Sequence, residues 1–88
     1  MDEIVNILKQ NRTKKLIVEA DFDFLGTIVR VKRVGTPTIL EEGFGGTEPW
    51  VTFAAGLGID KAVSVSRIVR ITDAEKDEVL FDKEENIK

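Results

Sequence analysis

Five basic side chains have the clearest chemical potential in this sequence: Arg30, Lys32, Arg33, Arg67 and Arg70. Arginine and lysine bind phosphate groups, so a cluster of them predicts nucleic-acid binding. Arg30 and Lys32 alternate with valines along one predicted strand, and Arg67 and Arg70 lie near a later one. If the two strands are close, the five residues form one patch for RNA or another nucleic acid. The same alternation is typical of an ordinary solvated strand face, and that interpretation stays open.

Three carboxylates at every second position form another group: Glu19, Asp21 and Asp23 share one face of a predicted strand. Paired carboxylates can bind a hard cation or share a proton. No second set of ligands is visible, so surface charge is the favoured interpretation. The chain also has no histidine, cysteine or tyrosine. We therefore expect no catalytic residue, no metal site, no cofactor and no enzymatic activity.

The glycine-rich segment 43–47 is similar to a phosphate-binding loop, but such loops precede a helix. Here Glu48, Pro49 and a predicted strand follow, so a turn is expected. Phe44 lies in this turn and Trp50 follows it, which makes both residues candidates for a loop contact with a partner. In the other interpretation Trp50 belongs to the core and Phe44 covers the end of the fold.

Length and charge limit the class of protein. A chain of 88 residues with 42% hydrophobic residues makes one domain. Residues 1–72 carry ten basic and nine acidic side chains, a net of +1, whereas residues 73–88 carry three and seven, a net of −4. No apolar run reaches the roughly 18 residues of a membrane span, and the first residues are acidic rather than basic. We expect a cytoplasmic protein with neither a membrane partner nor a small-molecule substrate.

The elements that position these residues are short. Ile4, Ile7 and Leu8 have helical spacing, which predicts an N-terminal helix. Predicted strands follow in segments 16–20, 27–34, 38–40 and 50–55 and in the stretch 63–72. Within that stretch the alternation changes phase at residues 66–68, which predicts a tight corner. A turn is predicted at residues 35–37, and a bulge or bend in segment 27–34.

Two motifs resemble the Sm-like family of Sm, Lsm and Hfq proteins. Residues Phe24 to Ile28 look like the apolar-x-Gly-x-apolar core of the first Sm motif, and Val63 to Ile71 look like the strand–turn–strand of the second. The resemblance implies a helix followed by five bent strands, RNA contacts, and rings closed by pairing edge strands. Residues 50–55, 63–65 or 69–72 would be those edges. The RNA-contacting residue types of the family are absent, since Val65, Ser66 and Arg67 stand in their place.

Together these patterns predict a mainly β fold. A short N-terminal α-helix and a small, strongly bent five-stranded β-barrel, of Sm-like or SH3-like type, form a domain over residues 1–72. Residues 73–88 form an acidic, partly ordered C-terminal extension, which could be helix, strand or disordered. The predicted role is a non-enzymatic assembly or binding module that forms a homo-oligomer through strand edges. The alternative is an Sm-like RNA-binding regulator that uses the five basic residues.

Overall fold

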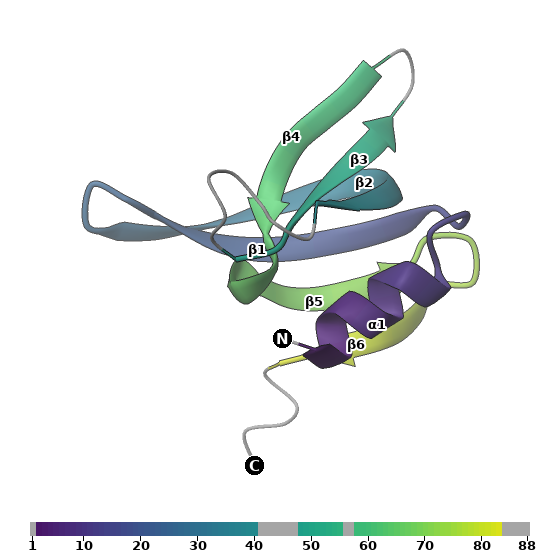
Figure 1. Cartoon of the computed structure of the whole chain (residues 1–88). Helices are drawn as coiled ribbons and strands as arrows, with labels where there is room; N and C mark the ends of the chain where they lie inside the picture. Colours follow the sequence, from purple (N-terminus) through teal and green to yellow (C-terminus); the bar gives the residue numbers. More distant parts are fainter. Residues whose placement is uncertain (1, 41–47, 56–57, 84–88) are drawn as a thin grey trace.

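A computed structural model describes residues 2–40, 48–55 and 58–83. These residues form one helix and six strands (Figure 1). The elements are, in chain order, α1 (Asp2–Gln10), β1 (Leu16–Phe24), β2 (Thr27–Leu40), β3 (Trp50–Ala55), β4 (Gly58–Ser64), the 3-10 turn η1 (Val65–Arg67), β5 (Ile68–Asp73) and β6 (Glu78–Asp82). The expected N-terminal helix and the mainly β class are confirmed. The tight corner predicted at residues 66–68 is also confirmed, because η1 joins β4 to β5 there.

The strands form one antiparallel sheet in the order β4-β3-β2-β1-β5-β6. In the described part of the chain β4 and β6 are the two ends of the sheet and do not pair with each other, so the expected closure into a barrel is not confirmed. The sheet has six strands instead of five because the chain after β5 turns back and pairs with it. Two of the expected edges are interior: β3 lies between β2 and β4, and β5 lies between β1 and β6.

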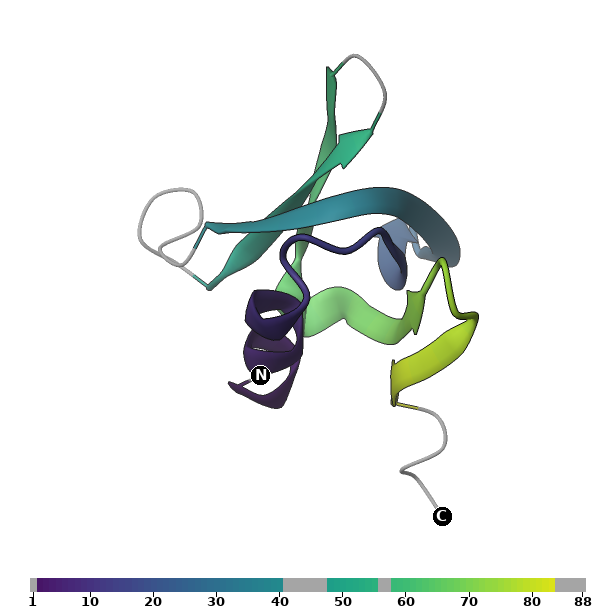
Figure 2. The ribbon, with the colours of Figure 1, turned by 90° about the vertical axis from the view of Figure 1, so that its right-hand side faces the viewer.

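Strand β2 connects the two halves of the sheet. Its first part, up to Gly35, pairs with β1, and its last part, from Thr36, pairs with β3. No turn interrupts the strand at residues 35–37, contrary to the prediction. Gly35 has a φ of +153°, and a Cβ atom there would lie 2.3 Å from the carbonyl oxygen of Ala54. The glycine allows β3 to approach closely where β2 changes partner. Beyond this point β3 and β4 rise away from β1 and β5 (Figures 1 and 2).

The core lies between α1 and the inner face of the sheet. On the helix Ile4 and Leu8 are buried, and α1 packs against β2 and β6. A helix of this length is marginal alone, so this apolar stripe must hold it in place. The strands and η1 contribute the rest of the core: Leu16, Val18, Ala20, Val51, Phe53, Val63, Val65, Ile68 and Ile71. Each large side chain that is fully buried contributes about 1.5–3 kcal/mol.

The C-terminal extension enters the sheet as β6. Leu80 and Phe81 pack against the core, so the ordered fold continues past the predicted domain boundary at residue 72. Of the three states left open for this extension, the structure shows a strand, and Asp73 caps the β5–β6 turn that leads to it. Its Oδ1 accepts hydrogen bonds from the backbone N–H groups of Glu75 (2.9 Å) and Lys76 (3.1 Å). The segment forms a strand rather than a helix because its residues pair with β5, and Leu80 and Phe81 cover the core.

Candidate functional site

The end of the β1–β2 hairpin leaves the sheet as a two-stranded arm, seen at the left of Figure 1. Strand β1 pairs with β5 only as far as Ala20, and β2 pairs with β3 only from Thr36. Residues 21–24 of β1 and 27–30 of β2 therefore have only each other as strand partners in the described part of the chain. We define residues 21–30 as the arm. Both of its edges are open, which leaves backbone groups available to another strand.

The arm carries most of the exposed large hydrophobic side chains of the described residues. The exposed fractions are 67% for Phe24, 92% for Leu25, 64% for Ile28 and 41% for Val29. Outside the arm, only Val79 belongs to this group among those residues. A single exposed hydrophobic residue is ordinary, whereas a cluster at the end of a projecting hairpin is typical of an interaction site.

Leu25 also has an unfavourable backbone conformation. It forms the two-residue turn of the arm together with Gly26, and the φ angles are +52° and +84°. Positive φ at both central residues is the type I′ geometry, which favours Asn-Gly or Asp-Gly. A leucine in this left-handed region costs about 1–2 kcal/mol. The left-handed backbone and the exposure of the side chain to water are both unfavourable for leucine. This combination points to a role for the side chain in contact with a partner.

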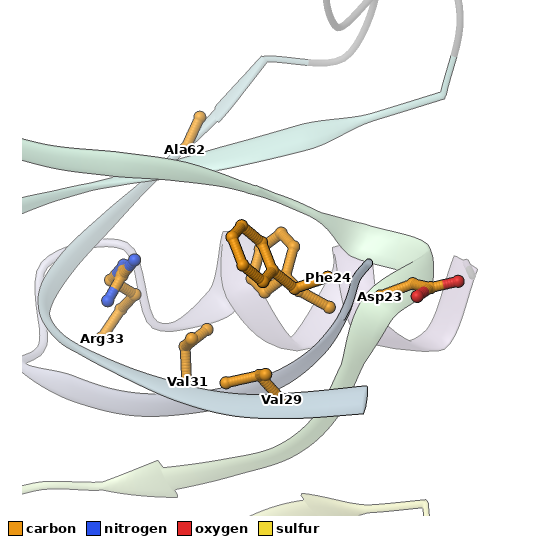
Figure 3. A pocket seen from close by; sticks show the side chains of 7 residues that line it. Asp23, Phe24, Val29, Val31, Arg33 and Ala62 are labelled. Carbon is orange, nitrogen blue, oxygen red and sulfur yellow. The ribbon is translucent and has the colours of Figure 1, made fainter. Parts of the chain in front are cut away.

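An open apolar groove of about 470 Å³ runs along one face of the arm. It is lined by Phe22, Asp23, Phe24, Val29, Val31, Arg33 and Ala62 (Figure 3). Phe22 lies opposite Val29 in the strand register, so their side chains share this face. In Figure 3 Phe24, Val29 and Val31 lie around the same open space, whereas the carboxylate of Asp23 points away from it. This carboxylate stabilises the turn: Asp23 Oδ1 accepts a hydrogen bond from the N–H of Gly26 at 3.1 Å.

The opposite face of the hairpin is charged, and on it Asp21 and Glu19 lie opposite basic residues, whereas Asp23 lies opposite Ile28. Arg30 binds Asp21 through two hydrogen bonds, Nε to Oδ1 at 2.7 Å and a terminal nitrogen to Oδ2 at 3.3 Å. The hydrogen bond from Arg30, and then its positive charge, lower the pKa of Asp21 against a smaller opposing effect of desolvation. Lys32 lies directly opposite Glu19 in the register. The same Glu19 lies 3.9 Å from Arg70 Nε.

The structure brings only part of the predicted basic patch together. Strand β1 lies between β2 and β5, and its carboxylates separate Arg30 and Lys32 from Arg70. Arg70 is also 3.9 Å from the carboxylate of Asp82 on β6. Arg33 lies on the groove face rather than on the charged face. Arg67 is exposed on η1, at the corner between β4 and β5. The charged face is therefore an alternation of signs rather than a basic surface.

The two loop candidates lie at different places. Phe44 is outside the described residues, and Trp50 is half-buried at the start of β3. Near Trp50 the corner between β4 and η1 is held by Ser64, whose Oγ donates to Glu48 Oε1 at 2.5 Å and lies 3.0 Å from Ser66 Oγ. The hydrogen bonds from Ser64 and Ser66 lower the pKa of Glu48. A carboxylate with a lowered pKa is a poor general base, so this cluster supports a structural role.

Within residues 2–40, 48–55 and 58–83 no three His, Cys, Asp or Glu side chains come together as metal ligands. In the same part of the chain the helix is too short and polar to cross a membrane. Comparisons of the chain with protein-family models, curated proteins and solved structures find no match.

Sequence reasoning did not identify the arm as a site. The resemblance to the first Sm motif used Phe24 and Ile28 as its apolar positions without predicting their burial, and both are among the most exposed large hydrophobic residues of the described chain. The period-two spacing of Glu19, Asp21 and Asp23 did indicate a strand here. A signal that could have revealed the arm is the length of the hairpin. Its two strands extend past the short β5, and a strand end without a second neighbour must be exposed.

Proposed function

We propose that this protein is a non-enzymatic assembly module whose arm binds a second copy of the chain. The observation that carries the proposal is the combination of two open strand edges with four exposed hydrophobic side chains at the end of one hairpin. A two-stranded ribbon is marginally stable in water unless another strand or a packed face supports it. Pairing with another copy supplies that support.

Burial of the hydrophobic side chains of the arm contributes favourable free energy to association. A hydrophobic side chain that passes from exposed to buried contributes about 1.5–3 kcal/mol, and Phe24, Leu25 and Ile28 are all more than half exposed. Their combined burial offsets a large part of the free energy lost when two molecules associate, about 4–15 kcal/mol. Hydrogen bonds between open strand edges add to the affinity and orient the two copies.

An Sm-like relationship is part of the same proposal. It is supported by the N-terminal α1, by the order of β1 to β5 in the sheet, and by the short η1 between β4 and β5. Strand β6 is an addition to that arrangement. It occupies the outer edge of β5, so assembly through β5 would require its displacement. The arm and the β4 edge need no such rearrangement.

RNA binding is the second candidate function, and the exposure of Lys32 and Arg67 favours it. Against it stands the pairing of Arg30 with Asp21 and of Arg70 with Glu19 and Asp82. A phosphate would have to compete with these carboxylates for the same guanidinium groups. Self-association is therefore the function that the geometry supports best.

Light scattering over a range of protein concentrations tests the proposal. We expect the wild-type chain to exceed the 9.8 kDa of one copy, and the Phe24→Ser/Ile28→Ser variant to remain a monomer. Val79→Ser is the matched control, because Val79 is 39% exposed but lies on β6, away from the arm. A wild-type monomer at every concentration would contradict the proposal, and so would equal loss of association in the control.

A further inference from the structure

The two open edges of the hairpin differ in length. Among the described residues of β1, only 21–24 lie beyond the pairing with β5. On β2 the open edge runs from Thr27 to Val34, because β3 pairs with β2 only nearer the end of that strand. Ile28 and Val29, both exposed, belong to this longer edge. The β2 edge therefore offers a second copy the greater length of unpaired backbone.

The rest of the molecule, which we call the body, limits how two arms can pair. An antiparallel ladder is the more stable kind. If it joined the β1 edge of one copy to the β2 edge of another, both hairpins would point the same way. The bodies would then lie side by side, roughly 10 Å apart, and β5 of one copy would collide with β3 of the other. Two like edges instead make the hairpins point in opposite directions, with the bodies at opposite ends.

Charge opposes the joining of two β1 edges. Side chains alternate between the two faces of a strand. A sheet extended across a two-fold axis therefore keeps one apolar face only if residues of the same face come opposite each other. On the open part of β1, this places Asp21 and Asp23 opposite these same carboxylates of the second copy. Because like charges directly opposite destabilise a strand pair, the β2 edge is favoured.

On the β2 edge one register joins apolar residues and separates the basic ones. With the two-fold axis at Ile28, this residue lies opposite Ile28 of the second copy, and Thr27 lies opposite Val29. Arg30 then lies opposite Gly26, near the turn of the other arm, so the two arginines stay apart. An axis at Arg30 or further along the open edge would place basic side chains opposite one another. In Figure 1 the arm projects away from β3 and β4, which leaves this end of the edge accessible.

The same register supplies opposite charges at both ends of the contact. Asp23 lies opposite Ile28 rather than a basic residue of its own chain. Its Oδ1 accepts the hydrogen bond from the N–H of Gly26 at 3.1 Å, so the carboxylate lies beside the turn. That turn is where Arg30 of the second copy arrives. Each Arg30 is then placed between Asp21 of its own chain and Asp23 of the other copy, and this arrangement occurs twice in the pair.

We infer that two copies join as a closed two-fold dimer through the β2 edges of their arms, with Ile28 of each copy at the axis. The inference rests on the proposed self-association and specifies its mode and its partner, a second copy of this chain. Leu25 at the turn comes beside Val31 of the other copy, which gives its exposed side chain an apolar contact. The contact is isologous: each β2 edge covers the other, so assembly stops at two copies. The strands of both arms form one continuous sheet, which supports each two-stranded ribbon.

Cross-linking through single cysteines tests this arrangement, because the chain has no cysteine of its own. Residues opposite each other in an antiparallel ladder have Cα atoms about 4.5–5.5 Å apart, within the range of a disulfide. We expect Ile28→Cys to form a covalent dimer under mild oxidation on the order of tenfold faster than any control, since only this residue meets its own copy at the axis. The controls, all at exposed positions, are Asp23→Cys for pairing of β1 edges, Val29→Cys for a register shifted by one residue, and Val79→Cys for random collision.

Exchange of charges tests the contact between Asp23 and Arg30. Asp23→Lys alone and Arg30→Glu alone each place like charges together at both ends of the contact. We expect each to dimerise on the order of tenfold more weakly by light scattering. An equimolar mixture should dimerise like the wild-type chain, because each new lysine then meets a glutamate and each remaining Asp23 meets an Arg30. The ion pair between Asp21 and Arg30 stays broken in one member of the mixture, so recovery is specific to the contact between copies.

Two further variants control for net charge. Glu75→Lys and Arg12→Glu make the same charge changes at exposed positions away from the arm, and they should dimerise like the wild-type chain. Circular dichroism confirms that every variant is folded.

The opposing results separate this inference from the proposed function. If the wild-type chain assembles but Ile28→Cys cross-links no faster than Val79→Cys, the two-fold contact is overturned and the proposed function stands. Assembly beyond two copies, or a mixture of charge variants that stays monomeric, would lead to the same limited conclusion. A wild-type chain that remains at 9.8 kDa at every concentration would overturn both.

Discussion

At the scale of single residues, Leu25 is the position where stability and association have opposite requirements. Its left-handed φ of +52° costs free energy in every isolated copy. Asparagine tolerates this conformation and is favoured at the first position of a type I′ turn. A sequence selected for folding alone would have little reason to keep leucine there. In the proposed assembly this leucine would supply a buried apolar contact, which the hairpin of an isolated copy does not need.

We therefore predict that Leu25→Asn stabilises the monomer and weakens association. A gain of about 1 kcal/mol raises the melting temperature of a domain of this size by about 4–8 °C. Thermal unfolding at low protein concentration measures the first effect, and light scattering measures the second. Leu25→Ala is the control, since it removes the apolar side chain and keeps the unfavourable φ. Stronger association of Leu25→Asn would contradict the role assigned to this leucine.

Asp73 provides a pH-dependent contribution to stability. The hydrogen bond from the backbone N–H of Lys76, then that of Glu75, and the charges of Lys14 and Lys76 lower its pKa below the ordinary 3.8, against desolvation. A carboxyl with a lowered pKa in the folded state stabilises the fold above its unfolded pKa. That contribution is lost as the pH falls through the folded-state pKa. The effect is confined to acidic conditions, below about pH 4.

We predict that Asp73→Asn lowers the melting temperature at pH 7 and that the difference from the wild-type chain shrinks below about pH 3. The neutral amide still accepts the two backbone hydrogen bonds but without the charge. Thermal unfolding followed by circular dichroism at both pH values gives the comparison. Asp77→Asn, in the same turn, controls for a general effect of substitution there. A difference that is the same at both pH values would rule out the ionised cap.

At the scale of elements, β2 determines the architecture, because it is the strand that changes partner. Its first part belongs with β1 and its last part with β3, and Gly35 lies where one pairing ends and the other begins. The arm follows from the same change of partner. Since β3 begins its pairing only at Thr36 and β5 ends its pairing at Ala20, the hairpin beyond them has no neighbours. The exposed site is therefore a consequence of strand lengths.

We predict that Gly35→Ala destabilises the fold by about 2–4 kcal/mol, because the added Cβ displaces the backbone of β3 and the φ is unfavourable. A Cβ at Gly35 would meet the carbonyl oxygen of Ala54 at 2.3 Å, whereas one at Gly26 would meet no atom within 4 Å. Gly26→Ala is thus the matched control and should cost only about 1 kcal/mol. Urea unfolding compares the two variants. Equal losses would show that close packing at Gly35 is unimportant.

At the scale of the whole molecule, the distribution of charge favours the proposed assembly over RNA binding. Residues 1–72 have a net charge of +1, from ten basic and nine acidic side chains, and on the sheet those charges alternate from strand to strand. Electrostatic attraction for a polyanion requires a surplus of positive charge on one surface. Alternating charges favour instead a partner with the complementary alternation, as a second copy of this chain has.

We predict a weak salt dependence for any binding of single-stranded RNA. Five phosphate contacts would give a log–log slope of about −3.5, and the contacts left by the ion pairs should give only about −1 to −2. Fluorescence anisotropy with a labelled oligonucleotide, at several salt concentrations, measures the slope. Strong binding with the steeper slope, lost in Arg30→Glu/Lys32→Glu, would favour the RNA-binding function over assembly.

Several features of this protein follow from its sequence alone. The spacing of Ile4 and Leu8 predicted α1, and hydrophobic patterns predicted strands where β1 and β5 lie. The burial alternates over the first part of β1, whereas in β5 every residue but Arg70 is buried. The break in phase after Val65 predicted the corner that η1 forms. These features depend on periodicity and on local backbone preferences, which are visible within a few residues of sequence.

Only the tertiary structure decided which strands are neighbours and where each pairing ends. The choice of β6 as the partner of β5 left the sheet open, and the separation of β2 from β5 by β1 divided the predicted basic patch. The exposure of Phe24 and Ile28 arose in the same way, from neighbours that end before the hairpin does. Pairing and burial depend on contacts between residues distant in the chain. Short-range periodicity shows which residues share a face but not what, if anything, covers it.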